Sequence, residues 1–281
     1  MIMTQRMVRA RGGTLIPALG LGTWRMGECE NRRQDEIAAL QLGLDVGFSL
    51  IDTAEMYGSG VAEQIVGEAI RGRRDEVFLV SKVLPSNSSR KGTINAVERS
   101  LKHLNCDHID LYLLHWPGPY PLEETFEAFE RLSDEGKIGR YGVSNFDTDG
   151  MEEVFATRRG EGVCVNQVLY NLAQRAAEDE LMAWCEMNDV ALMAYSPLDQ
   201  GSILEDSVLN EIANRHGVTA AAVAVAWTMR FPNIVSIPKA TAPNHIRACA
   251  AAYDIALTEE DLNAINRTFP PPMPGARLSV Y

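Results

Sequence analysis

The sequence has 281 residues, of which 46% are hydrophobic and 23% are charged. These fractions are typical of soluble globular proteins, and they exclude intrinsic disorder of the chain as a whole. The 26 Lys and Arg residues against 38 Asp and Glu residues give a net charge of −12. Such a charge disfavours binding to nucleic acid or to an anionic membrane surface. A chain of this length can bury a large core, and we expect residues 1–281 to form one domain.

The sequence gives little indication of a membrane span, a secretory signal, or a zinc or disulfide site built from cysteines. The longest stretch without Asp, Glu, Lys or Arg, residues 216–229, is shorter than the ~20 residues that a membrane span needs. The first residues lack the apolar core of a secretory signal, so we expect a cytoplasmic protein. No C-x-x-C motif occurs, which disfavours a zinc ribbon or a disulfide framework. We expect the five cysteines to pack inside helices or strands without a catalytic role: Cys29, Cys106, Cys164, Cys185 and Cys249.

Eight short apolar runs of strand length follow an N-terminal hairpin that we place around Gly12 and Gly13. Several of the runs are apolar without alternation, which is typical of strands buried on both faces in a parallel sheet. The runs cover residues 18–23, 48–53, 77–82, 109–115, 138–144, 163–167, 190–196 and 234–239.

Segments with helical periodicity separate these runs. Ile37, Leu40 and Leu44, for example, recur at the spacing of one helix face, with acidic residues between them. Two further helical stretches, residues 208–216 and 219–230, lie between the seventh and eighth runs. Eight strands alternating with helices predict an α/β fold, a (β/α)8 TIM barrel with an N-terminal β-hairpin and two extra helical segments near the C-terminal side.

Polar side chains stand at the end of nearly every predicted strand. Titratable and amide groups directly after apolar runs contribute little to stability. They are what an active site needs, because the C-terminal strand ends of such a barrel carry it. The residues are Thr23, Trp24, Asp52, Lys82, His115, Trp116, Ser144, Asn145, Gln167, Tyr195, Ser196 and Lys239.

Five motifs in order along the chain resemble the aldo-keto reductase family, and the similarity covers essentially the whole sequence. They are GFSLIDTAEMYG, LLHWP, GVSNF, AYSPL and IPK. The sequence is most similar to bacterial members that reduce small aldehydes such as methylglyoxal. The resemblance implies the barrel and reduction of a carbonyl by hydride transfer from a nicotinamide dinucleotide.

The resemblance also implies a catalytic set of Asp52, Tyr57, Lys82 and His115. Tyr57 would give a proton to the carbonyl oxygen, and a nearby Lys82 ammonium would lower the pKa of its phenol. Asp52 would pair with Lys82, and His115 would orient the carbonyl oxygen or share the proton. Each of these residues alone has a structural interpretation, as a rim aromatic, an ion pair or a core histidine, but together they favour a site.

The cofactor implied by the family is NADPH, with NADH possible. No G-x-G-x-x-G or P-loop motif is present, so a Rossmann domain is not expected. Thr23 and Trp24 would border the ribose and the substrate, and Asp52 would also belong to the cofactor-binding set. Lys239 and the position of His245, where NADP-using relatives have Arg, would hold the 2′-phosphate. The remaining cofactor-binding residues would be Ser144, Asn145, Gln167, Tyr195, Ser196 and Leu198.

Trp24, Met56 and Trp116 predict an apolar, aromatic mouth for a small carbonyl substrate, with the tail 269–281 as a further wall. We expect a monomer without nucleic-acid or membrane partners and without a metal. One alternative is a nicotinamide-binding regulatory barrel with slow turnover. Another is a metal-dependent barrel hydrolase, which the scattered histidines disfavour.

Overall fold

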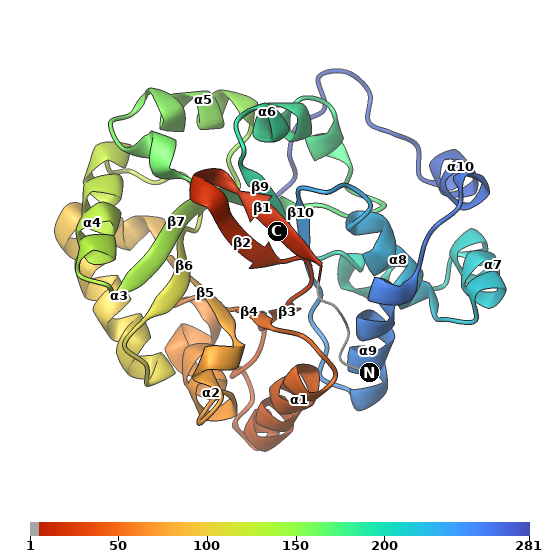
Figure 1. Cartoon of the computed structure of the whole chain (residues 1–281), viewed down its shortest axis with the longest axis horizontal. Coiled ribbons are helices and arrows are strands. Elements are labelled where there is room, and N and C mark those ends of the chain that lie inside the picture. The colour runs from red at the N-terminus through yellow and green to blue at the C-terminus, as the bar shows by residue number, and fades with distance from the viewer. Residues whose placement is uncertain (1–5) are drawn as a thin grey trace.

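The computed structural model describes residues 6–281; residues 1–5, part of the segment considered for a secretory signal, lie outside it. An antiparallel hairpin of β1 (Met7–Ala10) and β2 (Thr14–Pro17) comes first, as predicted. Gly12 and Gly13 turn it with φ of 70° and 74°, which glycine adopts without strain. The Arg11 amide donates to the Asp189 carbonyl at 2.6 Å, just before β9, so the hairpin lies across the N-terminal end of the sheet (Figure 1).

Eight parallel strands form a nearly closed barrel, which confirms the predicted fold. Neighbouring strands follow chain order from β3 to β10. The circle closes where Leu19 bridges Ser236 and where the Gly22 amide donates to the Pro238 carbonyl at 2.9 Å. The strands are β3 (Leu21–Gly22), β4 (Leu50–Asp52), β5 (Phe78–Val83), β6 (Ile109–Leu114), β7 (Ile138–Ser144), β8 (Val165–Leu169), β9 (Ala191–Tyr195) and β10 (Ile234–Ile237).

Helices surround the barrel (Figure 1), and side chains that cap their N-termini explain where several of them begin. Ser89, Asp147 and Thr219 each accept a hydrogen bond from a backbone amide of the first turn. The two extra helices between β9 and β10 are present. The helices are α1 (Arg33–Asp45), α2 (Val61–Ala69), α3 (Arg90–Leu104), α4 (Leu122–Asp134), α5 (Thr148–Ala156), α6 (Leu181–Met187), α7 (Ser207–His216), α8 (Ala220–Thr228), α9 (Pro243–Ala250) and α10 (Glu259–Thr268).

All the barrel strands except β7 depart from the predicted bounds, and three of these differences bear on the site. β3 is shorter than 18–23, because the backbone of 18–20 bonds to Ser236 of β10 and does not extend the ladder with β4. β8 is shifted toward the C-terminus, so Gln167 lies inside the strand and not at its end. β10 ends at Ile237, which leaves Lys239 on the loop that follows.

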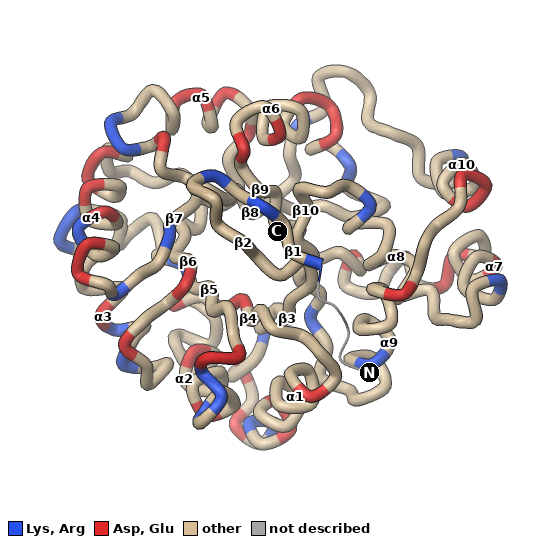
Figure 2. Tube along the Cα trace, viewed as in Figure 1, with Lys and Arg blue, Asp and Glu red and all other residues tan. Residues whose placement is uncertain are grey.

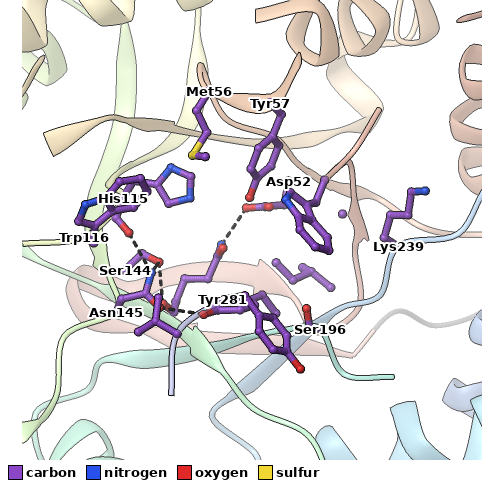
Figure 3. Close-up of a pocket in the computed structure, with 16 residues that line it drawn as sticks. Asp52, Met56, Tyr57, His115, Trp116, Ser144, Asn145, Ser196, Lys239 and Tyr281 are labelled. Atoms are coloured by element: carbon purple, nitrogen blue, oxygen red, sulfur yellow. Dashed lines mark hydrogen bonds between the residues drawn. The ribbon is translucent and has the colours of Figure 1, made fainter. Parts of the chain in front are cut away.

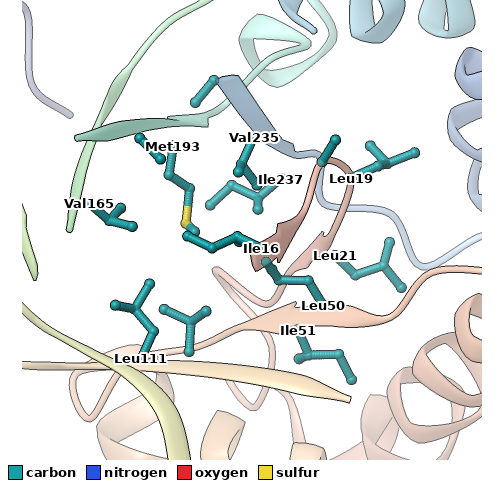
Figure 4. Close-up of a cluster of buried hydrophobic side chains, with 14 of the residues drawn as sticks. Ile16, Leu19, Leu21, Leu50, Ile51, Leu111, Val165, Met193, Val235 and Ile237 are labelled. Atoms are coloured by element: carbon teal, nitrogen blue, oxygen red, sulfur yellow. The ribbon is translucent and has the colours of Figure 1, made fainter. Parts of the chain in front are cut away.

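Apolar side chains from the strands and from the hairpin fill the base of the barrel. Ile16 of β2 lies among Leu50, Met193 and Val235, all fully buried (Figure 4). Charged residues lie mainly on the surrounding helices and loops (Figure 2). Within residues 6–281, no helix is long and apolar enough to cross a membrane. The packed base leaves the opposite end of the barrel for a site.

Candidate active site

A pocket of about 170 Å³ opens at the C-terminal ends of the strands. Most of the predicted site residues converge on it from different strands and loops (Figure 3). Its lining is Gly22, Trp24, Asp52, Met56, Tyr57, His115, Trp116, Ser144, Asn145, Gln167, Tyr195, Ser196, Ile237, Lys239, Val280 and Tyr281.

A chain of polar contacts links Asp52, Lys82 and Tyr57 at the floor of the pocket. Lys82, fully buried in β5, donates to Asp52 Oδ2 at 2.7 Å and to the Thr53 carbonyl at 2.8 Å. Its Nζ also lies 3.4 Å from the Tyr57 hydroxyl. Gln167 Nε2 donates to the other Asp52 oxygen at 2.8 Å. The carboxylate therefore holds Lys82 in a fixed position beside the phenol.

The electrostatics of Tyr57 differ from the expectation. Burial raises the pKa of the Tyr57 phenol well above its ordinary value, and the Asp52 carboxylate raises it further. The predicted net lowering of this pKa is therefore not found, although Lys82 Nζ lies 3.4 Å from the hydroxyl. Burial also lowers the pKa of Lys82, against the effect of Asp52. Tyr57 is consequently a protonated phenol at neutral pH and can donate its proton.

His115 follows β6 and lies beside Tyr57, with the two ring centroids 5.8 Å apart at an interplanar angle of 74°. Burial, together with the Lys82 charge, lowers the pKa of His115 well below its ordinary value, so the imidazole is neutral. Its buried Nδ1 has no hydrogen-bond partner among residues 6–281. A neutral ring that lines the pocket suits contact with a carbonyl substrate.

Amide and hydroxyl groups line the wall formed by β7, β8 and β9. Asn145 Nδ2 donates to the His115 carbonyl at 3.0 Å and to Ser144 Oγ at 3.1 Å, and the Tyr195 hydroxyl donates to Asn145 Oδ1 at 3.0 Å. Asn145 has φ of 64°, a strained value for a residue with a side chain. This network fixes the Tyr195 ring at the wall, where its face can stack on a planar group.

Three predicted cofactor residues do not line the pocket. Thr23 is fully buried and its hydroxyl donates to the Asp52 carbonyl at 3.0 Å, so it positions the end of β4. Leu198 is half-buried outside the lining, and His245 is exposed in α9. Lys82 also lies outside the lining, behind Asp52 and Tyr57.

Sequence reasoning missed part of the mouth of the pocket. Val280 and Tyr281 complete the lining, and the Tyr281 hydroxyl donates to Asp199 Oδ1 at 2.5 Å. The tail was expected as a wall, but its sequence has no periodicity that could name the contacting residues. Arg32 was also missed; its guanidinium donates to Thr241 Oγ1 at 3.2 Å, close to Lys239.

Two other expectations concern metals and cysteines. Within residues 6–281, no group of three or more His, Cys, Asp or Glu could hold a metal ion. The expected location of all cysteines inside helices or strands is wrong for Cys29, Cys106 and Cys164, which lie in loops. Cys29 is exposed and Cys106 is partly exposed, so only three of the five are buried. None lines the pocket.

The sequence model of the Aldo/keto reductase family matches residues 18–268. Methylglyoxal reductase YeaE of Escherichia coli is 44% identical over 96% of this chain and 97% of its own length. Glyoxal reductase of Bacillus subtilis is 34% identical over 92% and 91%. A crystal structure of an aldo-keto reductase from Klebsiella pneumoniae in complex with NADPH is 46% identical, with a TM-score of 0.95 over 99% of this chain and 100% of that one.

Proposed function

Because the chain belongs to the aldo/keto reductase family, whose members reduce carbonyl groups, we propose that it reduces small aldehydes and ketones with Tyr57 as the proton donor. The protein is an NADPH-dependent oxidoreductase. The observation that supports Tyr57 as the proton donor is a series of polar contacts from Asp52 through Lys82 to the Tyr57 hydroxyl, which lies at the pocket.

Reduction of a carbonyl needs a hydride on carbon and a proton on oxygen, and the nicotinamide supplies the hydride when bound. Tyr57 supplies the proton, since its raised pKa keeps the phenol protonated over the physiological range. Lys82, held by Asp52, places a positive charge 3.4 Å from the phenol oxygen. That charge stabilises the negative charge that Tyr57 acquires as its proton leaves.

His115 positions the substrate in this proposal. The ring is neutral and lines the pocket beside Tyr57. A neutral imidazole can donate a hydrogen bond to the carbonyl oxygen without competing with Tyr57 for the proton. Trp24, Met56 and Trp116 line the remainder of the mouth and exclude water from the reacting atoms.

The pocket also fits the nicotinamide part of the cofactor. Ser144, Asn145 and Gln167 present hydroxyl and amide groups to the cavity, which are the partners that a carboxamide needs. Tyr195 offers an aromatic face fixed by its hydrogen bond to Asn145. These four side chains would orient the ring, and Ser196 beside them would reach the adjoining ribose or phosphate.

The 2′-phosphate of NADPH needs positive charge, and the cations Lys239, Arg32 and Arg25 gather at one edge of the pocket. Lys239 lines the pocket, and the pKa of its amine is lowered by burial and by the Arg32 charge. Within residues 6–281, neither side chain has a carboxylate within 4.0 Å, whereas many arginines of this acidic protein are paired. We assign the 2′-phosphate to Lys239 with Arg32. His245 is exposed in α9 and would contribute only if its side chain turned toward these two residues.

The decisive experiment is a panel of small aldehydes and ketones, assayed with NADPH and with NADH at the absorbance of the reduced nicotinamide. Methylglyoxal and glyoxal belong in the panel, because two similar proteins are named for their reduction. Rapid NADPH oxidation by at least one compound supports the reductase. Tight NADPH binding without turnover of any compound favours the regulatory barrel.

A further inference from the structure

Behind strand β5, on the face opposite to Lys82, lies a buried carboxylate that the proposed chemistry does not use. Glu63, in the first turn of α2, is fully buried. Its Oε1 accepts from Ser81 Oγ at 2.7 Å, and its Oε2 accepts from His103 Nδ1 at 3.0 Å. Ser81 directly precedes Lys82, and consecutive strand residues point to opposite faces. Glu63 therefore joins the strand that carries Lys82 to helices α2 and α3.

The turn that carries Tyr57 leads directly into Glu63 and is strained. Gly58, Ser59 and Gly60 have φ of 54°, 54° and 91°, so three consecutive residues lie in the left-handed region. A residue with a side chain in this region costs of order 1–3 kcal/mol and persists only where its surroundings impose the conformation. Ser59 is such a residue, so the turn must be held by its neighbours.

Two neighbours hold the turn from opposite sides. The His103 ring packs on Gly60 so closely that a methyl group there would lie 2.6 Å from Cε1. On the other side, a methyl group on Gly58 would lie 3.0 Å from the Met26 carbonyl. Glu63 fixes the His103 ring by accepting a hydrogen bond from its Nδ1. Because Glu63 also accepts from Ser81, it links the His103 ring to β5. Glu63 therefore contacts the Lys82 strand directly and the Tyr57 turn through the His103 ring.

The charge of Glu63 also acts on Lys82. Burial lowers the pKa of Lys82, and the carboxylates of Asp52 and Glu63 both raise it, from the barrel side and from behind the strand. The other titratable groups around Glu63 are His103 on α3 and Tyr112 on β6, a phenol whose pKa is raised by burial and by Glu63. Removal of the Glu63 charge therefore removes one of the two anions that keep Lys82 protonated.

We propose that Glu63 is a positioning residue for proton delivery, which fixes the position of Lys82 relative to the Tyr57 turn through Ser81 and His103. This inference rests on the proposed role of Tyr57. It gives Glu63 an effect on kcat, although this carboxylate lies outside the pocket and would touch neither substrate nor cofactor.

The test uses Glu63→Gln, which keeps the shape of the side chain and removes its charge. We expect kcat for aldehyde reduction to fall about 10-fold or more, and the alkaline limb of its pH profile to move to lower pH, because Lys82 then loses its proton more easily. The dissociation constant of NADPH should stay unchanged. The matched control is Asp261→Asn, a second buried carboxylate with a histidine partner, His216, at 2.8 Å but far from the pocket in α10. It should lower the melting temperature and leave kcat and the pH profile unaltered.

Wild-type kcat and an unmoved alkaline limb in Glu63→Gln, with only a lower melting temperature, would overturn the inference. A crystal structure of Glu63→Ala gives a readout that is independent of activity: we expect the separation of Tyr57 and Lys82 to exceed the present 3.4 Å. If that variant does not fold, Ser81→Ala removes only the link to β5 and gives the same readout. An unchanged separation contradicts the inference, whereas a wild type that reduces no carbonyl compound contradicts the proposed function instead.

Discussion

At the scale of single residues, the proposed mechanism divides proton transfer between the phenol of Tyr57 and the ammonium of Lys82. The phenol is buried and protonated, so it is a donor before the reaction begins. Lys82 is fully buried with a carboxylate partner. A buried ion pair of this kind carries a large desolvation cost, so its presence favours a functional reason for the charge.

Replacement of Tyr57 by Phe tests this division. We expect kcat to fall by a factor of about 10²–10⁴, the range typical of a lost general acid. The dissociation constant of NADPH should be nearly unchanged, because the hydroxyl acts on the substrate oxygen in the transition state. Steady-state kinetics and a fluorescence titration of NADPH measure the two effects. A variant with near-normal kcat would show that another group donates the proton.

The choice between NADPH and NADH is also decided by few side chains. Arg32→Gln and Lys239→Ala should each weaken NADPH while leaving NADH nearly unaffected, because only NADPH carries the 2′-phosphate. The control is Arg33→Gln, the same charge change one residue away, at an arginine that pairs with Glu68 at 2.5 Å. Dissociation constants of both cofactors for the three variants measure the effect.

His245→Arg completes that series. An arginine there should tighten NADPH and reduce any pH dependence of the preference, if the exposed side chain reaches the phosphate. An NADPH to NADH ratio that Arg32→Gln and Lys239→Ala leave unaltered would place the 2′-phosphate elsewhere.

At the scale of the elements, the turn Tyr57–Gly60 is the piece of backbone that the site depends on most. Gly60→Ala should destabilise the protein by more than the ~1–2 kcal/mol of a left-handed residue, since the added methyl meets the His103 ring at 2.6 Å. It should also lower kcat by displacing Tyr57. The control is Gly136→Ala, with φ of 72° and nothing within 4 Å of the added methyl. Urea unfolding and kcat of both variants are compared, and equal effects would show that the His103 contact is unimportant.

The elements show what the sequence could predict and what it could not. Long apolar runs such as 77–82 and 109–115 located their strands, because burial on both faces leaves a clear pattern. β3 was overextended, since the apolar character of residues 18–20 serves closure of the barrel onto Ser236 and not the ladder with β4. Most pocket residues could be named from motifs. The contacts of Arg32, Glu63 and Tyr281 could not, because they depend on how distant segments pack.

At the scale of the whole molecule, the buried charges set how stability responds to acid. Burial and the Lys82 charge hold the pKa of His115 well below 6.5 in the folded state. Although burial acts to raise it, hydrogen bonds from Arg215 and His216 lower the pKa of Asp261 below its ordinary value. In both cases the unfolded chain binds the proton more readily than the folded chain, so stability is lost as the pH falls. For His115 the loss starts near pH 6.5, and for Asp261 it starts near pH 4.

The variant His115→Gln separates the loss of stability that comes from His115 from the loss that comes from Asp261 at lower pH. In the wild type, His115 should contribute a loss of up to ~1.4 kcal/mol for each pH unit between 6.5 and its folded pKa. Glutamine does not titrate, so the difference in unfolding free energy between wild type and variant should change between pH 7.5 and pH 5.5. Urea unfolding at both pH values measures it, and the Asp261→Asn variant, whose effect belongs to lower pH, serves as the control. Because the Lys82 ammonium helps to hold His115 neutral, Lys82→Met should weaken this acid sensitivity as well as abolish reduction. Parallel pH dependences in wild type and His115→Gln would mean that folding does not lower the pKa of His115, and the argument that the imidazole stays neutral over this pH range would fail.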